Sequence, residues 1–598
     1  MACGSAPATR SCAVSRCRRP TSSSHAHSRC AGCDRSVPPV ALRGSPQDAP
    51  RADIRHGVQP RVRIELNGRV TSAITTTDLI ARLRTDLAAA HFSVPGLTGL
   101  WGIEADAALY RNQRVPAQRA LAALATTLGR NEPAATLARL FLLGDPVPRA
   151  DLDAALSSLG AAGAEELGLV AAVDTLVRPL VDTLVRPLVD LRPYSFIDAH
   201  GAGSWWIVSD LGELALGHPL GESHVLGIGG ASRTLSGLMM PTPVARALDI
   251  GTGCGIQAMH ASRHAEHVVA TDISTRALEL AALNAELNEI DNIEFRFGSL
   301  FEPVAGERFD HIISNPPFVI TPRTEGVPSY EYRDGKMVGD ALVEAVVRGA
   351  AEHLTPGGIA QLLGNWEYRG DTDAFERLEH WLMPAQPSPA LDAWIIEREV
   401  QSPGEYAETW IRDGGTRPGL DFDRLYNAWL NDFAARDVRK VGFGYLLLRL
   451  PEAGAHESTL RRLERMPDAL GHNPAGLGAH LAECLAAHDW QARTDDARLL
   501  RTNLTVAPDV TEERHYWPGE ADPTLMTLHQ GSGFGRSVAL DTALAGLVGA
   551  SDGDLAVGAI IGALAQLLGA DEAALTAELL PRVRELLVDG FLIVPELI

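Results

Sequence analysis

Between residues 247 and 450, short apolar runs alternate with segments in which apolar residues recur at helical spacing. The runs have the length and the β-branched or aromatic content of buried strands. They are residues 247–250, 268–272, 293–297, 309–314, 359–363, 391–396 and 441–450. Helices are expected at 256–263, 274–288 and 341–353, with Ser274 near the cap of the second. This order predicts an α/β fold with a doubly wound, Rossmann-like sheet of seven strands, whose ligand lies at the carboxyl ends of the strands.

Leu and Ala recur at helical spacing from residue 64 to residue 190, which predicts a helical N-terminal region. The expected helices are 76–91, with Thr76 or Thr77 as its cap, and 116–128, 134–143, 150–159 and 164–176. The octapeptide of residues 174–181 recurs unchanged at 182–189, and the proline in each copy excludes one continuous helix. We interpret the repeat as a duplication in a linker. Residues 191–246 are expected to contribute short strands and turns, with His218 and His224 in structural roles.

The segments after the fourth strand suggest a lid and a further domain. Residues 321–340 are rich in Gly, Pro and charge and predict a lid or substrate loop, whereas 402–439 read as an insertion with buried aromatic residues. Helices are expected at 559–568, 572–580 and 582–588, followed by a turn and a strand, an ending that suggests a winged-helix module. We therefore divide the chain into a disordered basic tail, 1–63, a helical domain, 64–190, the α/β domain, 191–452, and a C-terminal domain, 453–598.

The net charge and the positions of the cysteines limit the classes of protein to which the chain can belong. The 598 residues carry a net charge of −22 and only two lysines, but the first 63 hold eleven Arg against three Asp. One interpretation of this basic segment is that the reading frame starts too early. Five of the seven cysteines lie before residue 34, so the folded part has no disulfide framework, and we predict a cytoplasmic protein without a membrane span. His25, His27, Cys30 and Cys33 could ligate zinc, but their spacing is unusual and we predict no metal site.

A glycine-rich segment follows the first strand of the α/β region. After Asp249, the residues Gly251, Thr252, Gly253 and Gly255 permit a tight turn and a close backbone approach to a ligand. The spacing differs from the dinucleotide fingerprint, and no P-loop lysine follows. The second strand ends at Asp272, whose carboxylate can bind both hydroxyls of a ribose.

The tetrapeptide Asn315-Pro316-Pro317-Phe318 follows the fourth strand. An Asn side-chain oxygen can accept one N–H of a planar amino or amide group, and the carbonyl of Pro316 can accept the other. The prolines stiffen the loop and keep both acceptors aimed, while Phe318 offers a flat face to a planar substrate. The tetrapeptide therefore indicates a clamp for a substrate nitrogen.

Together these motifs resemble the class I S-adenosylmethionine-dependent methyltransferases, and most closely the branch that carries an NPPF or NPPY motif. This branch includes release-factor glutamine methyltransferases and the adenine-N6 and guanine-N2 methyltransferases of RNA and DNA. The resemblance covers roughly residues 195–450. It implies S-adenosylmethionine as cofactor, with the transferred methyl already electrophilic, so that the protein supplies alignment and fixed dipoles.

The resemblance also assigns roles by position. The glycines of the turn, Gly251, Gly253 and Gly255, would line the methionine part of the cofactor. Asp272 would bind the ribose, and Ser299 with Leu300 would flank the adenine. Many relatives carry an acid where this chain has Ser299. Asn315, Pro316, Pro317 and Phe318 would hold the target nitrogen. The full cofactor set expected is Asp249, Gly251, Thr252, Gly253, Gly255, Asp272, Ile273, Ser299, Leu300 and Asn315.

Three functions remain open from the sequence. The first is methylation of a base amino group in RNA, or less readily DNA, because the flanking regions resemble those added for large RNA targets. The second is N5-methylation of a glutamine exposed on a protein. The third is a cofactor-binding scaffold without catalysis. The acidity of the chain weakens the first, and residues 541–598, with nine acids and two Arg, argue against DNA binding by a winged helix.

Overall fold

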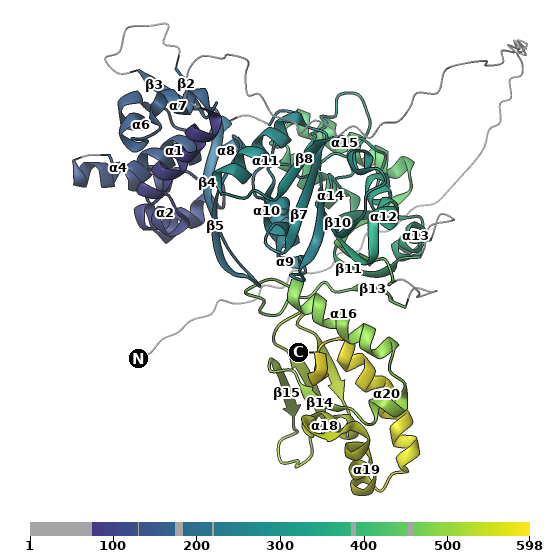
Figure 1. Ribbon diagram of the computed structural model, residues 1–598. Helices are drawn as coiled ribbons and strands as arrows, with labels where there is room; N and C mark the ends of the chain where they lie inside the picture. The colour runs from purple at the N-terminus through teal and green to yellow at the C-terminus, as the bar shows by residue number, and fades with distance from the viewer. Residues whose placement is uncertain are drawn as a thin grey trace, which may run out of the picture. The chain divides into compact units, whose positions relative to one another are not determined.

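The computed structural model describes residues 75–129, 131–173, 183–217, 220–383, 390–452 and 459–597. Its centre is an eight-stranded sheet in the order β13-β11-β12-β10-β9-β6-β7-β8 (Figure 1). The strands are β6 (Val244–Ile250), β7 (Ala265–Asp272), β8 (Ile293–Phe297), β9 (Phe309–Ser314), β10 (Leu354–Arg369), β11 (Asp392–Gln401), β12 (Val438–Arg449) and β13 (Arg461–Arg465). All neighbours are parallel except β12, which is antiparallel to both β10 and β11.

The first seven of these strands correspond to the predicted ones, which confirms the α/β fold class. The eighth, β13, was not predicted, because the sequence Arg-Arg-Leu-Glu-Arg has no apolar alternation and lies at the edge of the sheet. Helices α10 (Ile256–Ala261) and α11 (Thr275–Leu287) pack on β6 to β8, and α12 (Ala341–His353) and α13 (Ala374–Trp381) pack on β10.

Other helices near the sheet differ from the sequence expectation. Helix α9 (Gly230–Leu238) contacts β10 in a region where only strands and turns were expected. Its Gly and Ser content hid an amphipathic helix that buries Leu235 and Leu238. The predicted insertion forms α14 (Pro403–Asp413) and α15 (Leu420–Ala435), which pack on β12. Four shorter helical elements occur elsewhere along the described chain: α8 (Glu213–Leu216), η2 (Glu302–Val304), α17 (Asp496–Leu499) and η3 (Pro595–Leu597).

The N-terminal region has more helices than the five predicted, and it also contains short strands. Its helices are α1 (Thr76–Ala89), α2 (Val94–Trp101), α3 (Ile103–Leu109), α4 (Val115–Leu128), α5 (Pro133–Leu137), the π-helix η1 (Ala138–Leu142), α6 (Arg149–Ala155) and α7 (Gly160–Glu166). Thr75 caps α1, one residue before the predicted cap. The expected helix over 164–176 is wrong, because α7 ends at Glu166, Gly168 adopts φ +70°, and strand β2 (Val170–Ala172) follows.

Part of the octapeptide repeat has a structural role. Half of its second copy forms β3 (Leu184–Pro187), the middle strand of a small sheet between β1 (Val147–Pro148) and β2, so this copy is not a linker. The first copy lies outside the described residues, as do the basic tail with His25, His27, Cys30 and Cys33, and His218.

A long hairpin connects this region to the central sheet. It consists of β4 (Val189–Asp198) and β5 (Gly201–Asp210). Two asparagines one helical turn apart, Asn284 on α11 and Asn288 at its C-terminal cap, hold β5. Asn284 Oδ1 accepts from Val208 N at 2.7 Å and its Nδ2 donates to Val208 O at 2.9 Å. Asn288 binds the backbone N–H and carbonyl of Trp206 in the same way, at 2.9 and 2.8 Å. Side-chain amides therefore take the place of a neighbouring strand.

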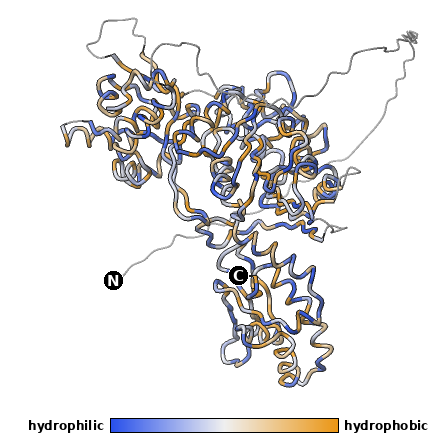
Figure 2. The backbone as a smooth tube through the Cα atoms, viewed as in Figure 1, coloured by the Kyte–Doolittle hydropathy of each residue, from blue (hydrophilic) through white to orange (hydrophobic). Residues whose placement is uncertain are grey.

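The C-terminal region contains the small sheets β18-β14-β19 and β15-β16-β17. Its elements are α16 (Gly478–Ala492), β14 (Asn503–Val506), β15 (Val510–His515), β16 (Leu525–Gln530), β17 (Ser537–Leu540), α18 (Thr542–Gly549), β18 (Asp552–Ala556), α19 (Val557–Leu568), α20 (Glu572–Val588) and β19 (Leu592–Ile593). The two helices predicted around Pro581 are one, because α20 continues its buried stripe through Leu580 and Val583. Hydrophobic and polar positions alternate along α16 and α20 (Figure 2). Within the described residues, no helix combines the length and apolarity needed to cross a membrane.

Candidate active site

The glycine-rich turn between β6 and α10 opens onto a pocket at the carboxyl ends of the central strands. Gly251 and Gly253 adopt φ +72° and +55°, and a Cβ at either position would meet no atom within 4 Å. The N–H groups of Gly251 and Thr252 donate to Thr271 O on the neighbouring strand at 2.9 and 3.0 Å. These bonds hold the turn, so that Gly251, Thr252 and Gly253 line the pocket.

Two residues of the predicted cofactor set do not line this pocket. Asp249 is fully buried behind the turn, where its Oδ2 accepts from Thr252 Oγ1 at 2.6 Å and from Ala258 N at 3.0 Å. Burial raises the pKa of its carboxyl to about 7. Gly255 begins α10 with φ +88°, and a Cβ there would lie 2.9 Å from Ala281 Cβ on α11. Asp249 fixes the turn and Gly255 allows two helices to approach, so both act behind the pocket.

Asp272 ends β7 and points into the pocket. Its Oδ2 accepts from Gly253 N and its Oδ1 accepts from Ser274 N, both at 2.9 Å. Burial raises the pKa of this carboxyl, and the backbone hydrogen bonds oppose the shift. The two bonds fix the orientation of the carboxylate and leave acceptor capacity on each oxygen for a diol.

The far end of the pocket is formed after β7 and β8. Ile273, Ser299 and Leu300, all three members of the expected cofactor set, line it. Leu300 adopts φ +47°, an uncommon conformation for a branched residue. Many relatives carry an acid where this chain has Ser299. Here the N–H of Ser299 donates to Glu302 Oε2 at 3.4 Å, so a carboxylate of the following turn lies close to this position.

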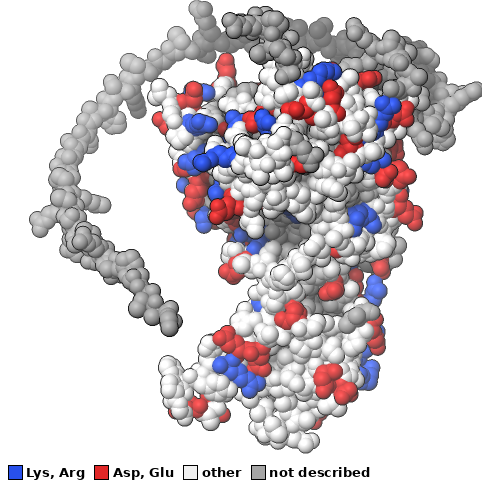
Figure 3. All heavy atoms as spheres, turned by 90° about the vertical axis from the view of Figure 1, so that its left-hand side faces the viewer, with Lys and Arg blue, Asp and Glu red and all other residues white. Residues whose placement is uncertain are grey.

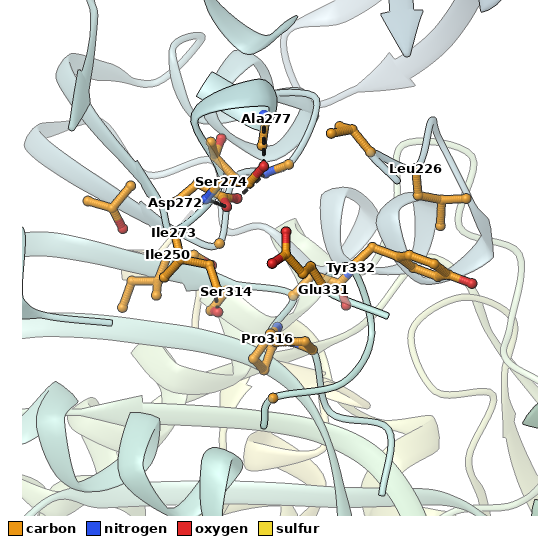
Figure 4. Close-up of a pocket in the computed structure, with 18 of the residues that line it drawn as sticks. Leu226, Ile250, Asp272, Ile273, Ser274, Ala277, Ser314, Pro316, Glu331 and Tyr332 are labelled. Atoms are coloured by element: carbon orange, nitrogen blue, oxygen red, sulfur yellow. Dashed lines mark hydrogen bonds between the residues drawn. The ribbon is translucent and has the colours of Figure 1, made fainter. Parts of the chain in front are cut away.

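The Asn315–Phe318 loop lies opposite Asp272, with Glu331 between Asp272 and Pro316 (Figure 4). Asn315 Oδ1 is buried and accepts no hydrogen bond from any described residue. The carbonyl of Pro316 accepts from Phe318 N at 2.7 Å, which leaves one of its two lone pairs. Asn315, Pro316 and Pro317 line the pocket.

Phe318 does not line the pocket with them. The residue is 9% exposed, and its ring packs against Phe443 and Trp410 at centroid distances of 5.5 and 6.3 Å. The predicted flat face for the substrate therefore lies on the other side of the loop, because contacts with β12 and α14 set the direction of the ring.

The predicted lid loop forms a wall of the pocket through Glu331, Tyr332, Asp334 and Lys336. Arg333, in the middle of this segment, donates to Trp410 O at 2.7 Å and to Asp413 Oδ2 at 2.8 Å on α14. Lys336 Nζ lies 3.1 Å from Glu331 Oε1. Glu331 and Lys336 were not predicted as site residues, since a loop rich in Gly and charge gives no signal of which side chains turn inward.

The opposite wall comes from residues 223–227 and from Ser232 on α9. His224, predicted to be structural, lies here, and its Nε2 is buried without a partner among the described residues. Burial lowers the pKa of its imidazole. The charged residues that line the pocket are Asp272, Glu331, Asp334 and Lys336, so its charge is negative. On the face drawn in Figure 3, Lys and Arg are interspersed with Asp and Glu and do not form one basic patch.

Three family models match the chain. Residues 228–377 match the methyltransferase small domain. Residues 89–180 and 482–594 match two domains of unknown function, DUF7059 and DUF7782. The match to the methyltransferase small domain contains the glycine-rich turn, Asp272 and the Asn315–Phe318 loop.

The chain is similar to curated and solved proteins over part of its length. It is 35% identical over 190 residues to the ribosomal protein uL3 glutamine methyltransferase of Bradyrhizobium diazoefficiens, which is 30% of this chain and 58% of that protein. It is 33% identical over 135 residues, 22% of this chain and 67% of the relative, to a protein of Methanocaldococcus jannaschii provisionally named as a protein N5-glutamine methyltransferase. A solved 16S rRNA N2 G1207 methyltransferase of T. thermophilus shares 18% identity over 41% of this chain and 59% of that chain, at a TM-score of 0.24. The chain thus spans only about half the length of several relatives that it matches.

Proposed function

Because the chain belongs to the class I S-adenosylmethionine-dependent methyltransferases of the NPPF branch, we propose that it methylates the side-chain nitrogen of a glutamine in a protein. The observation that carries this proposal is Asn315 Oδ1, a buried acceptor without a donor among the described residues, at the end of a pocket with the features of a cofactor site. A primary amide offers two N–H donors on a planar nitrogen, and the loop offers two acceptors.

The described residues fit the proposed cofactor. Gly251 and Gly253 leave open space where a ligand can approach the backbone, and Asp272 is oriented for a ribose diol. Ile273 and Leu300 would flank the adenine, beside the backbone N–H of Ser299. When bound, S-adenosylmethionine supplies an electrophilic methyl group.

The proposed chemistry needs alignment more than acid–base catalysis. Asn315 Oδ1 accepts one amide N–H, and the remaining lone pair of Pro316 O accepts the other. These two bonds orient the nitrogen and favour its pyramidal form, in which the lone pair can attack. The N–C bond forms as the S–C bond breaks, and the nitrogen then releases a proton to solvent, so no strong base is required.

Charge and relatives favour a protein acceptor over a nucleic acid. Three acids and one lysine line the pocket, and phosphate contacts require the opposite balance. The curated relatives are named for glutamine methylation of ribosomal protein uL3 and of release factors. We infer that the acceptor is a protein with an exposed glutamine and that the reaction occurs in the cytoplasm, where such factors act.

A base amino group of RNA is the second candidate. The observation in its favour is the aromatic cluster of Phe318, Trp410 and Phe443 beside the clamp, because aromatic rings can stack on an unpaired base. A basic path for the phosphates would have to accompany it, and the residues that line the pocket do not supply one.

Transfer of labelled methyl into an extract of a strain that lacks the protein tests the proposal. We expect label that is lost with protease and kept after RNase and DNase, and N5-methylglutamine in the hydrolysed product. Label lost with nuclease would replace the proposal with base methylation. Measured cofactor binding with no label in any fraction would instead support a scaffold.

A further inference from the structure

A second recess lies on the other side of the Asn315–Phe318 loop from the cofactor pocket. We define this acceptor recess by Phe318, Asn365, Glu399, Tyr406, Trp410 and Phe443. Aromatic side chains form much of its wall, with an amide and a carboxylate among them. None of these residues except Phe318 belongs to the motifs of the cofactor site.

The two pockets share their dividing walls. Pro316 and Pro317 line the cofactor pocket, and Phe318 of the same tetrapeptide lines the acceptor recess. Helix α9 does the same, with Ser232 on the cofactor side and Thr234 on the recess side. A substrate held at Asn315 is therefore next to the recess, and the chain that carries it can continue there.

Asn365 gives the recess a specific polar requirement. It lies on β10, is 1% exposed, and its Nδ2 donates to Tyr406 Oη. Tyr406 Oη also accepts from Ile320 N at 3.0 Å, and burial raises the pKa of the phenol, so the hydroxyl stays protonated. Asn365 Oδ1 is buried and has no hydrogen-bond partner among the described residues. A buried acceptor without a donor destabilises the fold, and an N–H from a bound molecule would satisfy it.

The charge of the recess selects between classes of bound chain. Glu399 is the one charged side chain among the described residues that line it, and no Lys or Arg does. A phosphodiester would be repelled and would bring no N–H from its backbone. A polypeptide brings an N–H at nearly every residue, and a basic side chain would be attracted to Glu399.

We propose that the acceptor recess binds the polypeptide segment around the methylated glutamine, with Asn365 Oδ1 accepting a backbone N–H of that segment and Glu399 selecting a basic neighbour. This inference rests on the proposed function and extends it to the local sequence of the acceptor. Asn365 and Glu399 act as binding and specificity residues, whereas Asn315 holds the reacting nitrogen.

Short acetylated and amidated peptides with one central glutamine, flanked by Arg, Ala or Glu, provide the test. With wild type we expect methylation in the order Arg, Ala, Glu. Asn365→Leu should raise KM for peptide about tenfold and leave KM for the cofactor unchanged. Glu399→Lys should reverse the order so that the Glu-flanked peptide becomes the better acceptor.

Two controls separate recognition from general damage. Glu408→Lys makes the same charge change on α14 outside the recess, where Glu408 pairs with Arg412, and should keep the wild-type order. Tyr406→Phe removes the partner of Ile320 N; if it raises KM for peptide while Asn365→Leu does not, packing and not Asn365 is responsible, and the inference fails.

The outcomes also distinguish this inference from the proposed function. If the peptides are methylated but Asn365→Leu leaves KM for peptide unchanged and Glu399→Lys leaves the order of the peptides unchanged, the role proposed for the acceptor recess would be overturned. Glutamine methylation itself would stand. If wild type methylates none of the peptides but does label the protein fraction of the extract, recognition of local sequence in the recess would also be overturned. Label only in RNA would overturn both.

Discussion

Replacement of Asn315 by Ala separates the nitrogen clamp from the fold. The Asn315 side chain makes no hydrogen bond to another described residue, and its Oδ1 is buried. Truncation therefore removes no internal bond, and we expect the thermal midpoint to stay close to that of wild type. The cofactor dissociation constant should also change little, because Gly251, Gly253 and Asp272 are untouched.

Catalysis should respond very differently. Asn315 Oδ1 acts on the amide nitrogen most strongly in the transition state, as the nitrogen becomes pyramidal. Loss of one such fixed dipole in a water-excluded site costs about 10²–10³ in kcat, or about 2.7–4 kcal/mol. Because the interaction strengthens only in the transition state, kcat and kcat/KM should fall together. Single-turnover transfer of labelled methyl from bound cofactor measures this loss directly.

A matched asparagine makes the reasoning refutable. Asn473 accepts from Gly533 N at 2.8 Å and donates to Gly471 O at 2.9 Å, so Asn473→Ala breaks internal bonds. It should lower the free energy of unfolding by about 1–3 kcal/mol and leave kcat unchanged. Turnover by Asn315→Ala within about threefold of wild type would show that the clamp has been misassigned.

Three further perturbations test the neighbouring groups. Asp272→Asn should weaken cofactor binding about 10- to 100-fold in calorimetry, since it removes the charge that would hold the diol; an unchanged dissociation constant would contradict the ribose assignment. Gly255→Ala adds a Cβ 2.9 Å from Ala281 to a residue in the left-handed helical region, at φ +88° and ψ 4°. Gly129→Ala makes the same change at φ +65° and ψ 13°, where the new Cβ would meet no atom within 4 Å. The first variant should be the more destabilised in thermal unfolding, and equal losses would argue against close packing. In the folded state the pKa of Asp249 is about 7, above its unfolded value, so the folded state holds the extra proton and the free energy of unfolding falls as pH rises from about 4 to 7, by at most about 1.4 kcal/mol per pH unit. Asp249→Asn should flatten this slope in denaturant titrations. An unaltered slope would refute the raised pKa.

The central strands of the sheet were predictable because they are buried on both faces. Strand β9 and helix α12 begin and end at the residues expected, since a continuous apolar run bounded by turn residues has few alternatives. The edge strand β13 and the continuation of α20 through Pro581 were missed, because neighbouring strands and a buried stripe decide them and local propensity points the other way.

The site was only partly predictable for a related reason. Motif spacing identified Asp272 and Asn315, whose positions follow directly from the ends of β7 and β9. It could not show that Phe318 turns away from the cofactor pocket, because Trp410 and Phe443 determine that direction. Asn365 had no signal at all, since its partner Tyr406 is 41 residues away in the chain.

The attachment of β5 to α11 has a consequence for the behaviour of the protein in concentrated solution. A hairpin of two ten-residue strands would normally offer two open edges to the strands of other molecules, a common route to aggregation. Asn284 and Asn288 occupy the N–H and carbonyl of Val208 and Trp206 on one of those edges. The same side chains that connect the hairpin to the α/β domain therefore protect it from self-association, and their loss should appear first as turbidity during expression or storage.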